Sequence, residues 1–462
     1  MKAIKNILSI CSVALLLGSC QADLLETKPY GNVAAGNMWT SENFADKGVT
    51  AIYSTLRKSY VGLGLYQMDC LGVSTDCRDA DYPIMRNTIT TSNGMFSSYW
   101  SEHYSGISRA NDAIVHLPEV DMPENKKARY MAEAKVLRAY FYYKLNIMYK
   151  GVPVYLEPVE ASECTKGQET EAAVWQVIED DLTAAINEPN LPNIYTEGSS
   201  DYGRVTKGLA YALRGKAYLY QKEYAKAAAD FEAVSQCGFG LFEGDYKQLF
   251  KEANEQSKEM IFSVQCIGLD GLGNDISFRY GTRSSFGSCW NTYLVNADFV
   301  ETYENADGSK FNWNDYIPGY NEMEPAARAV FFLRDGLTDA EKEAMKTAGA
   351  DMSKYLPEGN EARIKAAYAN RDPRLTASII TPYSTYDGAN GSNEYTYTLR
   401  WPFRAGDVSE PFDLKTDTNN RFYYLYRKFV AEGASEIPNR SYSPIDVPLI
   451  RYADILLNLA EC

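Results

Sequence analysis

Histidine is scarce in this sequence. Among 462 residues there are two, His103 and His116. Both fall on one predicted helix, at a spacing that points them to different faces. So few histidines argue against a histidine-based metal site and give little support to a Ser-His-Asp hydrolase. We therefore expect neither a metal nor another cofactor.

Paired Cys-x-x-Cys motifs are also absent. None of the nine cysteines forms the two closely spaced pairs of a typical zinc site. Cys70 and Cys77 are close enough in sequence to form a disulfide in an oxidising compartment, or they are two small buried thiols. The acidic segment with Asp76, Asp79 and Asp81 lacks the ligand spacing of an EF-hand, so it indicates a solvated loop.

Long apolar runs are missing after the first residues, and none reaches membrane-spanning length. The exception is the short run from Ile7 to Leu17, which follows Lys2 and Lys5 and precedes Gly18-Ser19-Cys20. A basic start, a short apolar core and small residues are typical of a secretory signal. With Cys20 at the cleavage position, residues 1–19 are similar to a bacterial lipoprotein signal. Lipid attachment at Cys20 would anchor the protein to a membrane without a spanning helix.

Acidic residues are in excess. The chain has 46 Lys and Arg against 61 Asp and Glu, a formal net charge of −15. Such a surface repels phosphate backbones, so we expect no nucleic-acid partner. The chain is 45% hydrophobic, enough for a sizeable core, and its 36 tyrosines suit both cores and wet binding surfaces.

Helical spacing of apolar residues dominates the first half of the chain. It predicts helices over 40–60, 98–117, 124–149 and 170–187, with a long loop region over 62–97. Residues 205–236 match the later part of a tetratricopeptide unit. There, small Gly215 and Ala227 let two helices approach, while Tyr218 and Phe231 fill the gap between them. Trp100 and Trp175 lie at core spacing, which indicates structural roles.

Beyond about residue 238 the pattern becomes irregular. Residues 259–264 and 421–430 are typical of strands, and long segments rich in Gly, Asn, Asp and Tyr separate them. Helical spacing returns at 451–461. The fold class predicted is mainly α: a tetratricopeptide-like helical scaffold over 20–237, followed by an irregular, loop-rich mixed α/β portion over 238–462.

Five stretches in a fixed order together resemble the SusD/RagB family. They are Tyr104-x-x-Ile107-x-x-Ala110-Asn111; Ala132-Glu133-Ala134-x-x-Leu137-Arg138-Ala139-Tyr140-Phe141-Tyr142 with Gly151-Val152-Pro153; Arg204-Val205-Thr206-Lys207-Gly208; Asn370-Arg371-Asp372-Pro373-Arg374-Leu375; and Pro448-x-Ile450-Arg451-Tyr452-Ala453-Asp454-Ile455-Leu456-Leu457. The resemblance implies an outer-membrane lipoprotein facing the cell exterior. Such a protein captures oligosaccharides without catalysis and delivers them to a SusC-like TonB-dependent transporter. In this family the last helix continues into further helices, so we expect the region 238–462 to be truncated.

Sugar recognition needs aromatic faces and planar polar groups on accessible loops. Trp290 is the first candidate, because it lies between polar residues before a helical stretch and where the family often presents a stacking aromatic. Three loop clusters supply the candidate ligand-binding residues: Tyr66, Asp76, Arg78, Asp79, Asp81 and Tyr82; Tyr280, Arg283, Trp290, Asn291 and Tyr293; and Trp313, Tyr316 and Tyr320.

Two other functions remain open from the sequence. One is an envelope tetratricopeptide scaffold that binds proteins or peptides, which a concave helical groove without exposed aromatics in the second half would favour. The other is a lipoprotein glycoside hydrolase, which needs two carboxylates flanking the scissile bond. Nothing among the 61 acidic residues marks such a pair.

Overall fold

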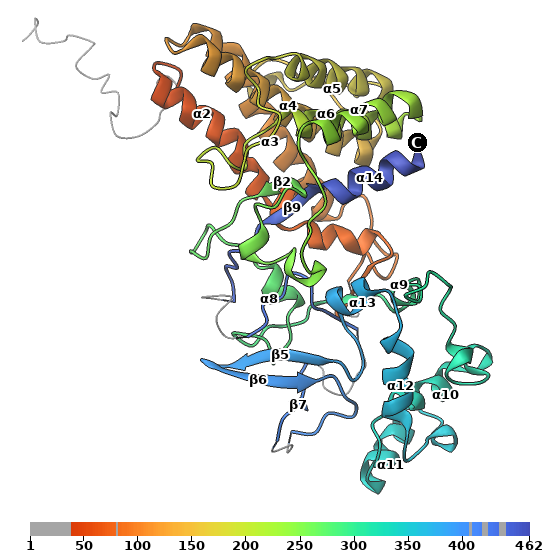
Figure 1. The fold of residues 1–462 in the computed structure, drawn as a ribbon. Coiled ribbons are helices and arrows are strands. Elements are labelled where there is room, and N and C mark those ends of the chain that lie inside the picture. Colours follow the sequence, from red (N-terminus) through yellow and green to blue (C-terminus); the bar gives the residue numbers. More distant parts are fainter. Residues whose placement is uncertain (1–37, 80–81, 406–408, 418–423, 434–439) are drawn as a thin grey trace, which may run out of the picture.

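The computed structural model describes residues 38–79, 82–405, 409–417, 424–433 and 440–462. The predicted signal over 1–19 and Cys20 lie outside these residues. Figure 1 shows a helical part at one end of the molecule and a loop-rich part at the other, with the last helix returning to the helical part. Within the described residues, no helix combines the length and apolar character needed to cross a membrane.

The first half of the chain forms consecutive helices that pack side by side. Their bounds are α2 (Glu42–Ser54), α3 (Gly94–His116), α4 (Glu124–Tyr149), α5 (Glu171–Ile186), α6 (Lys207–Tyr220) and α7 (Tyr224–Gln236). These bounds confirm the helices that the sequence predicts. Thr170 and Thr206 cap α5 and α6 by accepting from backbone N–H groups of their first turns. The last helix, α14 (Tyr452–Glu461), packs against α6 and α7.

The crossing of α6 and α7 depends on a residue without a side chain. A Cβ added at Gly215 would lie 2.6 Å from a ring carbon of Phe231. Phe231 and Ala227 are fully buried there. The close approach that the sequence predicts for this helical pair is therefore present.

Gly215→Ala is expected to lower the free energy of unfolding by about 1 to 3 kcal/mol, because the added methyl overpacks the contact with Phe231. Urea denaturation followed by circular dichroism measures the change. Gly167→Ala is the control, since no atom lies within 4 Å of a Cβ at that position. Equal midpoints for the two variants would contradict this account of the crossing.

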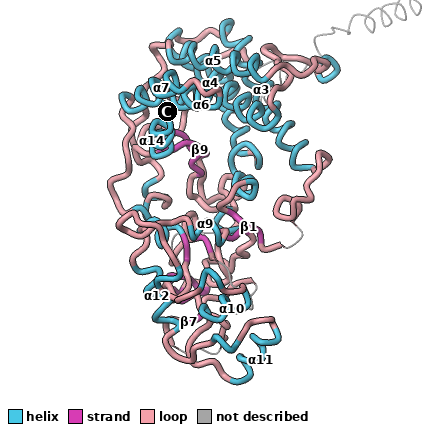
Figure 2. Tube along the Cα trace, turned by 90° about the vertical axis from the view of Figure 1, so that its right-hand side faces the viewer, coloured by secondary structure: helices cyan, strands magenta, loops and turns pink. Residues whose placement is uncertain are grey.

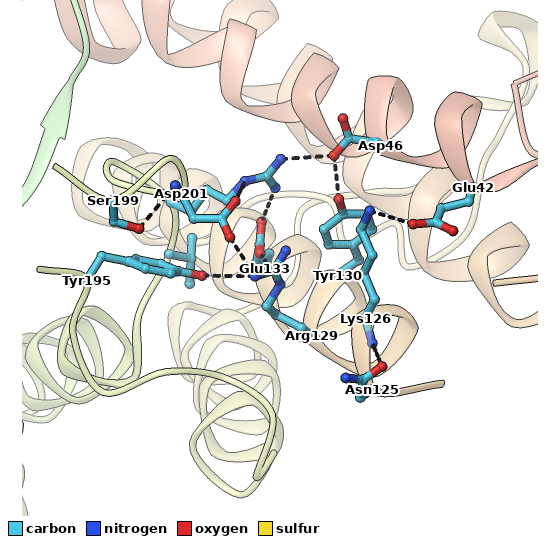
Figure 3. A network of polar contacts seen from close by, with 12 residues as sticks. Glu42, Asp46, Asn125, Lys126, Arg129, Tyr130, Glu133, Tyr195, Ser199 and Asp201 are labelled. Carbon is cyan, nitrogen blue, oxygen red and sulfur yellow. Dashed lines mark hydrogen bonds and ion pairs between the residues drawn. The ribbon is translucent and has the colours of Figure 1, made fainter. Parts of the chain in front are cut away.

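A buried polar network joins α2, α4 and the segment before α6 (Figure 3). Arg204 donates to Glu133 Oε2 at 2.9 Å and to Asp46 Oδ1 at 3.0 Å. Tyr53 donates to the same Glu133 oxygen at 2.7 Å, and Tyr130 donates to Asp46. Glu133 and Arg204 come from two of the stretches shared with the SusD/RagB pattern. Those residues therefore hold the scaffold together.

The second half contains short elements between long loops. Its helices are α8 (Ile276–Tyr280), α9 (Ala297–Glu301), α10 (Pro325–Ala329), α11 (Asp339–Thr347), α12 (Asn360–Ala369) and α13 (Pro373–Ser378). The strands of the chain are β1 (Thr75–Cys77), β2 (Met260–Val264), β3 (Tyr293–Val295), β4 (Ile379–Ile380), β5 (Thr385–Asn390), β6 (Asn393–Thr398), β7 (Phe412–Asp413), β8 (Leu425–Tyr426) and β9 (Val447–Arg451). Figure 2 shows how much of this half is loop.

The strands form small, separate sheets. Antiparallel pairs are β1–β3, β2–β9 and β4–β8, and β6 lies between β5 (antiparallel) and β7 (parallel). The strand predicted at 259–264 is confirmed as β2. The prediction for 421–430 is wrong in extent: within its described residues, 424–430, the strand is only Leu425–Tyr426, and Phe429 has a φ of +62° that ends extended pairing.

Candidate ligand-binding cleft

Pairing of β1 with β3 brings together two of the loop clusters that the sequence analysis selected. Thr75 lies opposite Val295 and Cys77 opposite Tyr293 in an antiparallel register. The Arg78 N–H then donates to the Thr292 carbonyl at 2.9 Å. Arg78, Asp79 and Tyr82 therefore lie in the same region as Tyr280, Arg283, Trp290 and Asn291. Asp81, the remaining candidate of the first cluster, lies outside the described residues.

Asp417 joins the two clusters through two arginines. Its carboxylate accepts from Arg283 Nε at 2.7 Å and also accepts from the Arg78 guanidinium. Arg78 donates further to the Trp290 carbonyl at 2.6 Å and to Asp79 Oδ1 at 3.0 Å. Charge-assisted hydrogen bonds of this kind fix the planes of both guanidinium groups. Asp417 was not among the sequence candidates.

Trp290 is presented at the surface on a rigid support. Its side chain is 39% exposed, and its indole packs on Phe278 with ring centroids 4.8 Å apart. The flanking residues Ser288 and Asn291 have φ values of +58° and +37°, which hold the loop in a tight bend. One part of the indole is thus packed, while another part is available to solvent.

Tyr280 and Asn291 lie in the interior. Tyr280 is 4% exposed and stacks on Tyr426 at 4.0 Å, and Asn291 is fully buried, with its side-chain carbonyl accepting from the Asp417 N–H at 2.8 Å. This corrects the expectation that these two side chains contact a ligand directly. Asn291 instead connects the Trp290 loop to the segment at Asp417, and Tyr280 packs in the interior against Tyr426.

The first cluster contains one further buried tyrosine, and its other members differ in exposure. Tyr66 is 6% exposed and donates to Asp275 Oδ1 at 3.0 Å. Tyr82 is half-buried and meets Tyr293 edge to face, whereas the Asp79 side chain is 59% exposed. Tyr82 and Asp79 thus keep accessible surface.

Cys70 and Cys77 are free thiols, and burial raises the pKa of Cys70 to about 12.

The third cluster belongs to a second hydrophobic core. Trp313 and Tyr320 are 3% and 6% exposed and pack together with Phe332. The Trp313 indole donates to Glu301 at 3.0 Å. The candidate role of Trp313 and Tyr320 as accessible sugar platforms is therefore corrected to a structural one.

A cleft lies next to the Trp290 loop and was not recognised in the sequence. It has a volume of about 850 Å³, and Arg283 and Ser288 are part of its wall. Five half-buried aromatic side chains contribute to its apolar surface: Phe286, Tyr395, Tyr397, Phe403 and Phe412. The charged side chains in the wall are Arg283, Arg404, Asp413 and Lys415. Aromatic faces with a few fixed charges are the usual composition of a ligand site.

The β5–β6 hairpin builds one wall of this cleft. A two-residue turn, Gly391-Ser392, joins the strands, and Gly391 has the positive φ of +64° that such turns require. Tyr395 and Tyr397 are two residues apart on β6, so they share a face, and both meet Phe412 of β7 at ring-centroid distances of 5.6 and 6.1 Å. This alternation beside a turn signal was the sequence pattern that could have located the cleft.

Among the described residues, half-buried Glu255 and buried Asp446 form a close pair of carboxyl groups that resembles a hydrolase dyad. The Asp446 N–H donates to Glu255 Oε2 at 3.4 Å, and Asp446 Oδ2 has no hydrogen-bond partner among the residues that the structure describes. Burial and then repulsion from Glu255 raise the pKa of Asp446 to about 8, and burial raises that of Glu255 to about 7. The cavity beside them is about 10 Å³, which holds one water molecule at most. This cavity is too small for a sugar ring, so the pair does not support hydrolysis.

Asp446 should make stability depend on pH. The folded chain keeps a proton on Asp446 where the unfolded chain has lost it, so the free energy of unfolding falls as pH rises. The expected slope is about 1 kcal/mol per pH unit between about pH 5 and pH 7. Asp446→Asn should reduce this slope to the part that Glu255 contributes, and urea denaturation at several pH values measures it. An unchanged slope in the variant would contradict the assignment to Asp446.

Metal ligation finds no support in the described part of the chain. No group of three or more His, Cys, Asp or Glu side chains is placed there to hold an ion. His103 is fully buried, and desolvation lowers its pKa to about 3, while His116 pairs with Asp112. Both histidines thus have partners within the helical part.

Comparisons with known proteins identify the family. Residues 258–462 match the model described as "SusD family", and residues 25–219 match "Starch-binding associating with outer membrane". The chain therefore belongs to the SusD family. A SusD-like protein of Bacteroides ovatus is 24% identical over 338 residues, which are 68% of this chain and 60% of the relative. The chain thus spans about 60% of that relative's length.

Solved structures share the fold. A SusD-like protein of Bacteroides fragilis matches with a TM-score of 0.69 and 20% identity, covering 93% of this chain and 76% of the other. A structure described as "Laminarin binding SusD-like protein" matches with a TM-score of 0.60 and 24% identity, covering 92% and 80%. At these identities the likeness establishes the fold alone.

Proposed function

We propose that this protein binds oligosaccharides at the outer face of the outer membrane and delivers them to a SusC-like TonB-dependent transporter. The observation that carries the proposal is the cleft of about 850 Å³ whose wall combines five half-buried aromatic rings with fixed arginines beside exposed Trp290. Pyranose rings offer apolar faces for such side chains and hydroxyl groups for the polar ones. The starch-binding description of the matched family model and the laminarin-binding relative support this class of ligand.

The aromatic cleft also separates this function from a protein-binding scaffold. A tetratricopeptide scaffold would use its helical groove and would not need accessible aromatics in the second half. Here Phe286, Tyr395 and Trp290 keep accessible surface around one cleft of the second half, while the helical part also exposes Tyr220 and Tyr224. The observation favours glycan capture over peptide capture.

The proposal includes attachment to the membrane through a lipid on Cys20 and a role without catalysis. Mass spectrometry of the N-terminal peptide from membrane-extracted protein tests the lipid. Release of reducing ends from a bound glycan by clean protein would contradict the non-catalytic role.

A screen of oligosaccharides with the full-length protein in detergent tests the function. Affinity electrophoresis in gels containing single polysaccharides identifies ligands, and calorimetry then measures their dissociation constants. We expect at least one glycan to bind in the micromolar to millimolar range, and a failure of every glycan class to bind would overturn the proposal.

A further inference from the structure

We propose that the cleft takes an anionic glycan, whose sugar residues carry carboxylate or sulfate groups. This inference rests on the proposed glycan-binding function and adds the class of sugar. It starts from the charges of the cleft wall, whose described residues include three cations, Arg283, Arg404 and Lys415, and one acid, Asp413. The chain as a whole has the opposite balance, with a formal net charge of −15. A cationic wall is therefore a local feature that the composition does not explain.

The one acid of the wall is already compensated. Asp413 is 4% exposed, and it forms ion pairs at 2.6 Å with both Arg334 and Arg400. The backbone N–H of Arg404 donates to the same carboxylate at 2.8 Å. Two guanidinium groups and one N–H thus surround one buried negative charge, so Asp413 does not present a negative surface to a ligand.

Two of the three cations in the described wall, Arg283 and Arg404, are paired with acids. Asp417 is one carboxylate shared between Arg78 and Arg283, and Glu341 pairs with Arg404. The Lys415 side chain is exposed, and its ammonium group has no acidic partner among the residues that the structure describes. Its N–H donates to Ser284 Oγ at 2.9 Å, which places Lys415 beside the Arg283 segment.

Besides Asp417 and Glu341, a further acid lies near the cleft without being part of its wall. Burial, then Tyr395 and Glu410, raise the pKa of Tyr397, so Glu410 is close to the aromatic side of the cleft. Lys415 and Arg283 supply positive charge to the cleft wall. A ligand whose rings lie on Tyr395 and Tyr397 would therefore direct its anionic groups toward Lys415 and Arg283.

Cations beside apolar surface favour anionic ligands for a physical reason. Partial exclusion of water strengthens the attraction between an ammonium or guanidinium group and a carboxylate or sulfate. A neutral glycan would leave the Lys415 charge partly desolvated and unpaired, which lowers its affinity. The wall thus discriminates by charge as well as by ring stacking.

Calorimetry on the full-length protein in detergent, with three sets of oligosaccharides, tests the inference. The sets are neutral glucans, oligogalacturonides and sulfated dextran fragments. We expect an acidic set to bind most tightly and to weaken when NaCl is raised from about 0.05 M to about 0.5 M. Tight binding by oligogalacturonides identifies carboxylate as the recognised group, and tight binding by the sulfated set identifies sulfate.

Lys415→Gln is the diagnostic variant, and Lys365→Gln is the charge-matched control on an exposed position of α12. The first should weaken binding of the acidic ligand about three- to fivefold, and the second should leave it unchanged. Tightest binding by neutral glucans, or equal affinities of the two variants for the acidic ligand, would overturn this inference and leave glycan binding intact. Absence of binding to these three sets would overturn this inference, and absence of binding to every glycan class in the screen would overturn the proposed function itself.

Discussion

Arg138→Met is expected to lower the free energy of unfolding by about 3 to 5 kcal/mol, because it leaves a buried carboxylate without its counter-ion. Arg138 Nε and Nη2 donate to the two oxygens of Asp181 at 2.7 and 2.8 Å. Its remaining nitrogen donates to Asn111 Oδ1 at 2.8 Å and to the Leu156 carbonyl at 3.1 Å. Both charged side chains are almost fully buried. One residue therefore joins α3, α4, α5 and the segment after α4.

The loss of stability in Arg138→Met should depend on pH. Burial already raises the pKa of Asp181, and removal of Arg138 would raise it further. The folded variant then holds a proton that the unfolded chain releases, so its free energy of unfolding falls as pH rises. Urea denaturation at several pH values measures both the loss and its slope.

Two further variants make this result interpretable. The double variant Arg138→Met with Asp181→Leu removes both charges and should recover much of the stability. Lys342→Met breaks an exposed ion pair with Asp339 and should change stability by at most about 0.5 kcal/mol. A loss for Arg138→Met as small as that for Lys342→Met would show that Asp181 finds water or another donor.

The helical scaffold was predictable because its signals are local. Apolar residues at helical spacing define α2 to α7 and α14. Residues in the stretches shared with the family form contacts between these helices and their neighbouring segments. Arg138 meets Asn111, Arg204 meets Glu133, and a Cβ on Gly106 would clash with the Phe141 ring. Arg371 has the same kind of role in the second half: its guanidinium donates to the carbonyls of Val300 and Tyr303, at the end of α9. These motifs therefore identify the fold, and they say little about the ligand.

The cleft was less predictable because it depends on distant pairings. Asp417 meets Arg283 and Arg78, which are 134 and 339 residues away in sequence. The exposure of an aromatic residue is equally hard to infer. Trp313 and Trp290 both lie in polar segments, yet Trp313 is buried in the second core and Trp290 is at the surface. Local sequence gives the residue type, and the long-range packing decides which rings face solvent.

Trp290→Ala is expected to weaken glycan binding roughly tenfold or more, because an exposed indole face contributes on the order of one to a few kcal/mol when it stacks on a sugar ring. Phe278 supports the indole from one side, and the Trp290 carbonyl is held by Arg78 at 2.6 Å. The backbone of the loop does not need the indole for these contacts. Calorimetry with the best ligand measures the affinity, and a thermal melt measures stability, which should change little.

Tyr224→Ala is the matched control for this variant. Tyr224 is a comparably exposed aromatic, at 43%, on α7 in the helical part. Its removal should change neither glycan affinity nor ligand selectivity. If Trp290→Ala binds glycan as tightly as Tyr224→Ala, the indole only covers Phe278 and the sugar platform lies elsewhere in the cleft. A marked drop in melting temperature for Trp290→Ala would instead show that the indole is a packing residue, because an exposed ring that only awaits a ligand adds little to the folded state.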